Sequence, residues 1–406
     1  MAGAGSEMGK GDPGMEDIYY WDPVTGPRIA FKGPTGTAGG HYLTGPIYVC
    51  GAEPGDVLEV QILDLLPRPN PQNESFGITT AGSIGWWNRT GYSTPGYNPS
   101  RAGAVVYKAI KDPETGRPAY WEPQYLFDNS DPSLNKTVSG CVPTENFTGA
   151  TYSGLVYDSP EEIRDYSVKG KWRIPINMHI GNMGLAQATG VPTITAPPSR
   201  TGGNIDNKRI GIGATMFYPV EAAGALLSMG DCHGSQGDGE SVATGVETSL
   251  NGKFRIILHK ADSLPTKLQL INYPIIENVN EIIIQGYAYQ DWLREIPNPQ
   301  VNVSKVGPYG GVDLNRAMST IYNETRAFLI HNYNLTEDMA ASGAGYQHYE
   351  LMPRSLGVDF EITQIVDSNV GIHAKIPKWL FNSTLWETEP YYQASVKTGT
   401  SRTSYP

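Results

Sequence analysis

The stretch Val57-Leu58-Glu59-Val60-Gln61-Ile62-Leu63 alternates apolar with polar side chains through most of its length. A period of two is typical of a β-strand, because successive side chains of a strand point to opposite faces of the sheet. The Gly-Asp pair at 55–56 stands between this stretch and the apolar residues 47–50, which predicts a β-hairpin. Further strands are predicted where short apolar or alternating runs recur, at residues 254–259, 267–271, 281–289 and 358–366.

One segment has helical spacing instead. From Asp313, a suitable N-cap, apolar side chains recur near the i, i+3, i+4, i+7 pattern as far as Leu329, so a helix is expected to residue 332. A shorter helix is expected from Thr336, because two acids follow it and acids suit a helix N-terminus.

These elements predict a mainly β protein, α+β overall: a β-sandwich or jelly-roll-like body with a small C-terminal helical hairpin. The 47 glycines and 31 prolines in 406 residues agree with many short strands and turns. Residues 1–40 are expected to form a flexible or extended N-terminal arm. Residues 41–406 are expected to form a single β-rich domain, which includes the helical segment at about 313–345.

The composition argues against several classes of partner. A net charge of −11 without any basic run disfavours nucleic acid and anionic membrane surfaces. No stretch approaches the roughly 18 uninterrupted apolar residues of a membrane helix, so no membrane partner is expected. Three cysteines, Cys50, Cys141 and Cys232, are too few for a disulfide scaffold.

Two features of the sequence point to different locations. Residues 1–17 lack the apolar core of a signal peptide, which favours a cytoplasmic protein. Asn-x-Ser/Thr sequons are more frequent than composition alone predicts, and they would suit a secreted protein whose signal peptide has been removed. They begin at Asn73, Asn88, Asn135, Asn146, Asn302, Asn323, Asn334 and Asn382.

The segment from Gly230 to Glu240, GDCHGSQGDGE, concentrates polar chemistry in a short glycine-rich loop. Period-two geometry at a strand end lets Asp231 and His233 point the same way and offer an oxygen and an imidazole to a divalent metal. Glu240, and further on Glu247, could supply another ligand or a general acid/base. The alternative is a glycine-rich surface turn whose acids are merely solvated.

Four ordered blocks surround and include this loop. They are His-Tyr-Leu-Thr-Gly-Pro at 41–46, Gly-Ala-Glu-Pro-Gly-Asp at 51–56, Gly-Gly-Asn-Ile-Asp at 202–206 and the 230–240 block itself. In this order they resemble the acetamidase/formamidase family, whose members hydrolyse short amides to the carboxylate and ammonia. The resemblance covers roughly residues 39 to 66 and 173 to 380, whereas 70–171 matches weakly, and it implies a β-rich fold and a homo-oligomer.

The chemistry of amide hydrolysis, together with these blocks, suggests roles for particular residues. His41 would join Asp231 and His233 as a metal ligand, and Glu240 would act as general base, with Asp238 and Glu247 as further catalytic acids. The implied cofactor is a divalent metal, Zn²⁺ with Ca²⁺ as the alternative, and zinc lowers the pKa of bound water to about 7. The substrate, formamide before other short amides, would be bound by Asn204, Asp206, Gln236 and His179.

Several alternatives stay open. His41 could cap its turn, His179 could shape the pocket, and Glu247 could be the buried partner of an Arg or Lys. Cys141 with Glu145, or Cys232, would permit an amidase with a cysteine nucleophile. A non-catalytic β-sandwich that binds carbohydrate would use aromatic pairs such as Trp86-Trp87. A further alternative is a degenerate relative retained for assembly.

Overall fold

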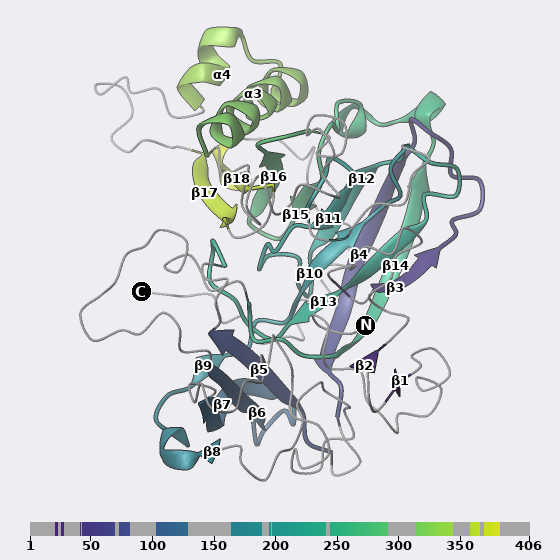
Figure 1. The fold of residues 1–406 in the computed structure, drawn as a ribbon. Coiled ribbons are helices and arrows are strands. Elements are labelled where there is room, and N and C mark those ends of the chain that lie inside the picture. Colours follow the sequence, from purple (N-terminus) through teal and green to yellow (C-terminus); the bar gives the residue numbers. More distant parts are fainter. Residues whose placement is uncertain are drawn as a thin grey trace.

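Two antiparallel sheets form the body of the protein (Figure 1). The computed structural model describes residues 21–22, 26–27, 41, 43–69, 73–81, 103–128, 164–188, 195, 197–240, 244–290, 314–343, 358–365 and 369–381. Together with the C-terminal helices, the sheets confirm the predicted mainly β class. Within the described part, no helix combines the length and the apolar character needed to cross a membrane.

The larger sheet has seven strands in the order β14-β4-β12-β15-β16-β18-β17. The alternating stretch at residues 57–63 lies in β4, which pairs with both β12 and β14. The strand bounds are β4 Val57–Pro67, β12 Thr215–Pro219, β14 Leu250–His259, β15 Ile275–Glu277, β16 Glu281–Tyr287, β17 Asp359–Gln364 and β18 Gly371–Pro377.

The smaller sheet has four strands in the order β11-β10-β13-β3. β13 lies between β10 and β3, so its residues have a hydrogen-bonded neighbour on either side. The bounds are β3 Leu43–Ile47, β10 His179–Gly184, β11 Gly202–Asn204 and β13 Leu227–His233.

Each face of the seven-stranded sheet has its own apolar core. Leu58, Val60 and Met216 pack with Ile180 and Met229 of the smaller sheet, which makes a sandwich. The opposite face carries residues in the alternate positions, such as Val57, Phe217, Ile282 and Ile372, and packs against a helix. The polar positions of β4 are therefore buried too, and Gln61 donates to Glu59 at 2.7 Å.

The helix on that face is α3, Leu314–Tyr333, and it is followed by α4, Glu337–Gly343. α3 buries Ala317, Ile321 and Phe328, as the helical spacing of the sequence predicts. Helix α3 approaches the sheet closely at Gly286 of β16, where an added Cβ would lie 2.7 Å from the Cβ of Ile321. Thr336 caps α4 by accepting a hydrogen bond from the Met339 N–H, whereas the predicted N-cap of α3, Asp313, lies outside the described residues.

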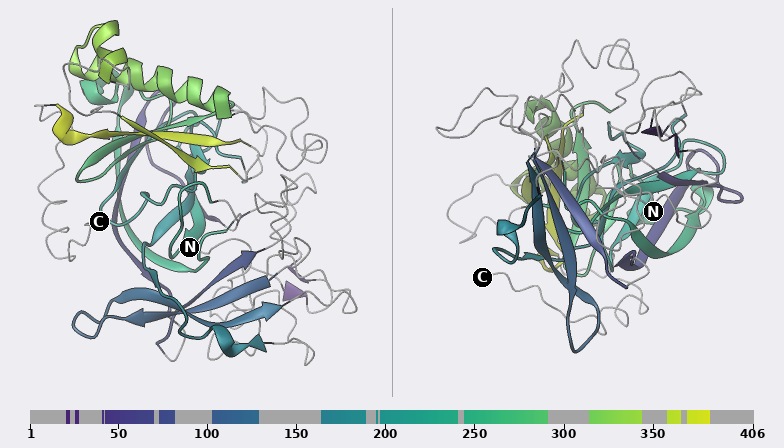
Figure 2. Two further views of the ribbon diagram at one scale, coloured as in Figure 1. Left: turned by 90° about the vertical axis from the view of Figure 1, so that its left-hand side faces the viewer. Right: turned by 60° about the horizontal axis from the view of Figure 1, so that its bottom comes forward.

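A third, five-stranded sheet lies at the end of the molecule opposite the helices (Figure 2). It contains β5 Phe76–Ala81, β6 Gly103–Lys111, β7 Pro118–Asp128, β8 Arg164–Asp165 and β9 Ile174–Pro175. Its Trp121 packs with Val246, which ties the sheet to the segment that follows β13. Within residues 1–40 the structure describes only β1, Trp21–Asp22, paired with β2, Gly26–Pro27, so the predicted arm lies mostly outside the described residues.

Two strand predictions are wrong. Residues 48–50 and 267–271 are not in strands, because β3 ends at Ile47 and Thr266–Leu268 form a 3-10 turn. The predicted hairpin is also wrong, since β3 pairs with β13 in one sheet while β4 pairs with β12 and β14 in the other. The apolar residue Leu268 is buried in the helix-side core from its turn, which explains an apolar run without a strand.

Asp56 fixes the turn that leads into β4. Its buried carboxylate accepts hydrogen bonds from the backbone N–H groups of Glu53 and Ala261, at 2.9 and 2.8 Å, and contacts the Lys260 ammonium at 2.6 Å. Burial raises the pKa of Asp56, but Lys260 and the two N–H donors outweigh burial and lower the pKa below its ordinary value. Asp56 thus joins the turn before β4 to the segment that follows β14.

We expect Asp56→Ala to lower the free energy of unfolding by about 2 to 3 kcal/mol at pH 7, because the donors lose their acceptor. Because the folded pKa is depressed, this advantage of the wild type is fully present above the unfolded pKa of about 4. It is lost as the pH falls through the lower folded pKa. Urea unfolding at pH 7 and pH 3 measures both effects, with the exposed Asp262→Ala as control. An equal difference at both pH values would contradict the account.

Candidate active site

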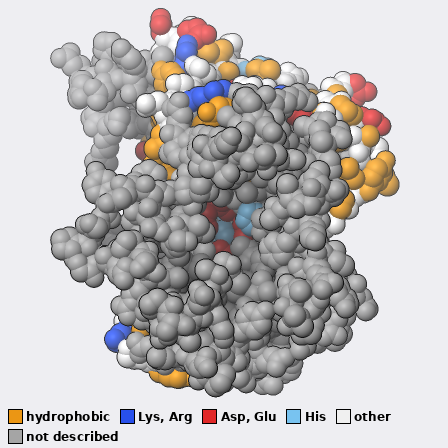
Figure 3. All heavy atoms as spheres, in the orientation of Figure 1, with side chains coloured by type: hydrophobic (Ala, Val, Ile, Leu, Met, Phe, Trp, Pro, Cys, Tyr) orange, Lys and Arg blue, Asp and Glu red, His pale blue; other side chains and the backbone are white. Residues whose placement is uncertain are grey.

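β13 brings the predicted site residues together from both of its neighbours. On one side β10 pairs with it so that His179 lies opposite His233. On the other side β3 pairs with it, and His41, just before β3, places Nε2 3.4 Å from Oδ2 of Asp231. Figure 3 shows acidic and histidine side chains together in a hollow, in the region where Figure 1 places β10 and β13.

Hydrogen bonds fix the orientation of the His233 ring. Its Nδ1 lies 2.6 Å from Oε1 of Gln236, whose own amide nitrogen donates to the backbone carbonyl of Asp206 at 2.6 Å. Since the Gln236 oxygen can only accept, Nδ1 of His233 carries the proton. The second ring nitrogen of His233, Nε2, is then available on the side of the ring that faces away from Gln236.

Three carboxylates lie on that side. Nε2 of His233 is 3.3 Å from Glu247, 3.6 Å from Asp231 and 3.8 Å from Glu240. All four side chains are buried, and Nε2 of His233 and Oδ1 of Asp231 have no hydrogen-bond partner among the described residues. Burial lowers the pKa of His233, but the charges of Glu247 and Asp231 outweigh it and raise the pKa well above the ordinary value.

His179 supports His233 from the opposite side, where its Nε2 lies 3.3 Å from Nδ1 of His233. Its Nδ1 donates to the carbonyl of Asn177 at 2.7 Å, and its ring packs edge-on against His233 with centroids 5.1 Å apart. Burial and the neighbouring charge of His233 lower the pKa of His179 to about 4, so it is neutral at pH 7. A neutral His179 adds no charge beside His233.

His41 is held in place as well. Its Nδ1 lies 3.1 Å from Oγ1 of Thr195 and 3.3 Å from Nδ2 of Asn182, which leaves Nε2 toward Asp231. Burial raises the pKa of Asp231, but the charges of His41 and His233 outweigh it and lower the pKa. Asn182 and Thr195 were not singled out in the sequence; Asn182 lies in β10, three residues after His179.

The donor atoms fit a divalent cation. One ligand atom each from Asp231, His233 and Glu247 lie within 4.8 Å of one another, and the same holds for Asp206, His233 and Glu240. Carboxylate oxygen and imidazole nitrogen are usual ligands of Zn²⁺. The buried atoms of Asp231 and His233 that lack a hydrogen-bond partner in the described part of the chain are those that a cation would satisfy.

The acids occupy unusual backbone positions. Asp206 and Asp231 have φ of 52° and Glu240 has φ of 40°, in the left-handed region that side chains other than glycine rarely adopt. Such strain costs of order 1–3 kcal/mol per residue and is found most often at functional sites. These angles turn the three carboxylates out of regular strand geometry.

The remaining predicted residues fall into different places. Asn204 and Asp206 are buried beside β10, and Glu247 lies 3.3 Å from Nε2 of His233. Asp238 lies in a separate cluster, where its carboxylate is 2.6 Å from Lys208 and 2.9 Å from Arg209. The sequence did not predict that the side chain of Asp238 lies apart from those of Asp231 and Glu240. The side chains of a loop do not point in directions that repeat with a fixed period.

The structure argues against Cys232 as the nucleophile of a cysteine-dependent amidase. Cys232 is completely buried, and burial raises the pKa of its thiol to about 12, so it stays protonated at pH 7. Cys141 and Glu145, like the Trp86-Trp87 pair, lie outside the described residues.

The sequence pattern of the Acetamidase/Formamidase family matches residues 36–382. The chain belongs to this family. Over 228 residues it is 33% identical to an acetamidase of Mycolicibacterium smegmatis. The aligned region covers 49% of this chain and 48% of that protein. It is 28% identical to a formamidase of Methylophilus methylotrophus over 203 residues, 49% of this chain and 47% of that protein. The matches thus span about half the length of these curated relatives.

The fold of this family member is found in a solved structure. The crystal structure of an acetamidase from Bacillus halodurans is similar with a TM-score of 0.53 and 21% sequence identity. The similarity covers 84% of this chain and 79% of that one, so it extends over most of both chains. It supports the β-rich architecture and carries no argument about substrate.

Gly181 of β10 allows the acids and the imidazole of this family member to meet. A Cβ at this position would lie 2.8 Å from Oδ1 of Asp206, 2.8 Å from Cε1 of His233 and 2.6 Å from the backbone oxygen of Asp231. A methyl group therefore cannot enter without moving residues that would hold the cation.

We expect Gly181→Ala to weaken Zn²⁺ binding roughly 10- to 100-fold, because displaced ligands and supporting groups lower metal affinity by that order. Equilibrium dialysis with elemental analysis measures the affinity. Gly237→Ala is the control, since its Cβ would meet no atom of the described residues within 4 Å. Equal zinc affinity in the two variants, both folded by circular dichroism, would rule out the predicted arrangement.

Proposed function

We propose that this protein hydrolyses short aliphatic amides, formamide first among them, to the carboxylate and ammonia. The observation that carries the proposal is the buried convergence of Asp231, His233, Glu240 and Glu247 around one imidazole nitrogen. The names of the curated relatives, acetamidase and formamidase, support the same reaction class.

We further propose a divalent metal, Zn²⁺, at this place. Asp231 and His233 would hold it together with His41, as the sequence suggests, or with Glu247, which the distances favour. An imidazole at the centre favours Zn²⁺ over Ca²⁺, because Ca²⁺ takes oxygen ligands. When bound, such an ion lowers the pKa of water and polarises a carbonyl.

Glu240 is proposed as the general base that takes a proton from water and passes it to the leaving nitrogen. Its side chain is buried within 3.8 Å of His233, beside the place where the reacting groups would meet. Hydrolysis of an amide needs both proton transfers, since the nitrogen leaves only after it is protonated. Glu247 lies 3.3 Å from Nε2 of His233 and accepts a hydrogen bond from the Gly245 N–H at 3.2 Å.

The polar residues around the acids divide into two roles. Both ends of the Gln236 amide are engaged within the protein, so we assign Gln236, with His179, to orienting His233 rather than to binding substrate. Asn204 and Asp206 remain the proposed substrate-binding residues. The burial of these side chains suits a small substrate, although a pocket distinguishes one methylene by only about 1–3 kcal/mol.

The test is ammonia release by the purified protein from formamide and acetamide, before and after strong chelation. We expect the wild type to release ammonia and Glu240→Gln to lose on the order of 10²- to 10⁴-fold in kcat. The exposed Glu114→Gln is the matched control and should keep full activity.

Two results would count against the proposal in different ways. No ammonia from either amide would reject amide hydrolysis. Ammonia release that survives both metal removal and His233→Ala would keep the amidase and reject the metal. The homo-oligomer implied by the family remains a prediction, to be tested by ultracentrifugation.

A further inference from the structure

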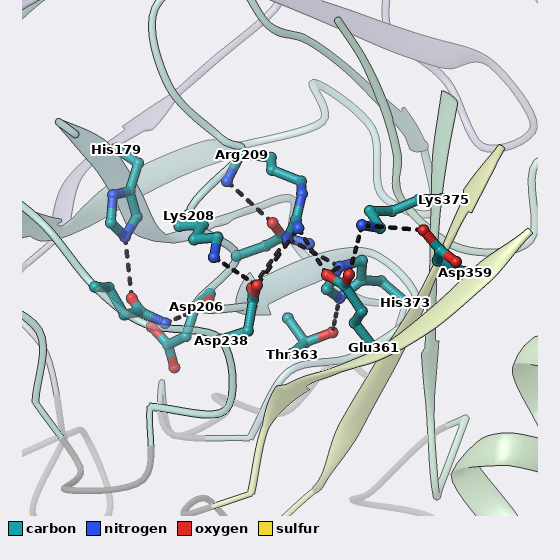
Figure 4. A network of polar contacts seen from close by, with 12 residues as sticks. His179, Asp206, Lys208, Arg209, Asp238, Asp359, Glu361, Thr363, His373 and Lys375 are labelled. Atoms are coloured by element: carbon teal, nitrogen blue, oxygen red, sulfur yellow. Dashed lines mark hydrogen bonds and ion pairs between the residues drawn. The ribbon is translucent and has the colours of Figure 1, made fainter. Parts of the chain in front are cut away.

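Beside the proposed site lies a second cluster of charges, centred on the Arg209 guanidinium (Figure 4). Arg209 donates to both oxygens of Asp238, at 2.9 and 3.4 Å, and to Glu361 of β17 at 2.7 Å. It also lies 3.0 Å from Nε2 of His373 in β18. One side chain thus joins a loop of the four-stranded sheet to two strands of the seven-stranded sheet.

This cluster is balanced in charge. Lys208 contacts Asp238 at 2.6 Å, and Lys375 contacts Glu361 at 2.5 Å and Asp359 at 3.5 Å. Three cationic side chains, those of Lys208, Arg209 and Lys375, therefore face three carboxylates, those of Asp238, Asp359 and Glu361. Asp238, Glu361 and His373 are close enough to hold a metal, but the guanidinium already contacts all three.

The state of His373 follows from its partners. Arg209 can only donate, so Nε2 of His373 accepts and the ring is neutral, with its Nδ1 proton toward Oγ1 of Thr363 at 2.8 Å. Burial lowers the pKa of His373, in agreement with a neutral ring. Nε2 of His373 therefore presents a lone pair that accepts a hydrogen bond from the Arg209 guanidinium.

The cluster is attached to the site by backbone as well as side chains. Asp238 lies between Gln236 and Glu240, and the backbone of the next residue, Gly239, forms hydrogen bonds with β17 and with the residue that follows it. Its N–H donates to the Thr363 carbonyl at 3.1 Å, and its carbonyl accepts from the Ile365 N–H at 3.2 Å. Held at Asp238, the loop has little freedom to move Glu240 away from His233.

We propose that Arg209 is a positioning residue for the reaction, which holds the 234–240 loop so that Glu240 stays against His233. This inference rests on the proposed amide hydrolysis for its kinetic consequence. The planar fork of arginine contacts three partners at once, whereas the single ammonium of lysine replaces the charge without the fork. Arg209 acts on the loop through its contact with Asp238.

The test compares Arg209→Gln and Arg209→Lys with wild type by formamide kinetics and hydrogen–deuterium exchange. In Arg209→Gln we expect faster exchange confined to the 234–240 loop. We also expect kcat to fall on the order of 10²-fold, as for a reacting group misplaced by about 1 Å, with KM changed less. Arg209→Lys should restore part of kcat, since it keeps the charge and one contact.

Arg117→Gln is the matched control, because it breaks an Arg–Asp pair of 2.6 Å with Asp64 at an exposed position. It should change neither the exchange of the 234–240 loop nor kcat. Unchanged exchange of that loop in Arg209→Gln would overturn the inference, as would a loss of protection spread over both sheets with kcat falling only as the folded fraction falls. If the wild type hydrolyses no amide, the proposed function fails, and the exchange comparison alone decides whether Arg209 holds the loop.

Discussion

Three buried carboxylates facing one imidazole nitrogen form the constraint on which the centre of this protein depends. A buried charge is stable only where opposite charge or hydrogen-bond donors replace the lost water. Asp231, Glu240 and Glu247 lie within 3.8 Å of Nε2 of His233, and Gln236 keeps the other ring nitrogen protonated. The site therefore requires positive charge at Nε2, which either a proton or a metal ion can provide.

The two packed sheets make this arrangement possible. β13 is an interior strand of the smaller sheet, so His41 and His179 reach it from opposite sides. Because the core on one face of the larger sheet packs against β10 and β13, these strands have a rigid backing. Packing of this kind can support the left-handed backbone of Asp206, Asp231 and Glu240, which would be unfavourable in an isolated loop.

The two charged clusters of the molecule differ in a way that bears on function. Around Arg209 every anionic group faces a cationic side chain, so the cluster is already neutral and joins loop to sheet. Around His233 three buried acids face one imidazole nitrogen, and buried atoms of Asp231 and His233 lack hydrogen bonds within the described part of the chain. The first arrangement suits holding a structure together, and the second suits binding something from outside it.

The sequence alone determined some of the local elements and the family. The alternation of residues 57–63 predicts β4, helical spacing predicts α3, and the two-residue spacing of Asp231 and His233 places them near one another. Only the tertiary structure decided that β3 pairs with β13 rather than with β4, that Glu247 faces His233, and that Asp238 turns to Arg209. Periodicity reports which face of a strand is buried but not which strand lies beside it, and loop side chains have no period at all. Their directions are set by contacts between residues far apart in the chain, which no local pattern contains.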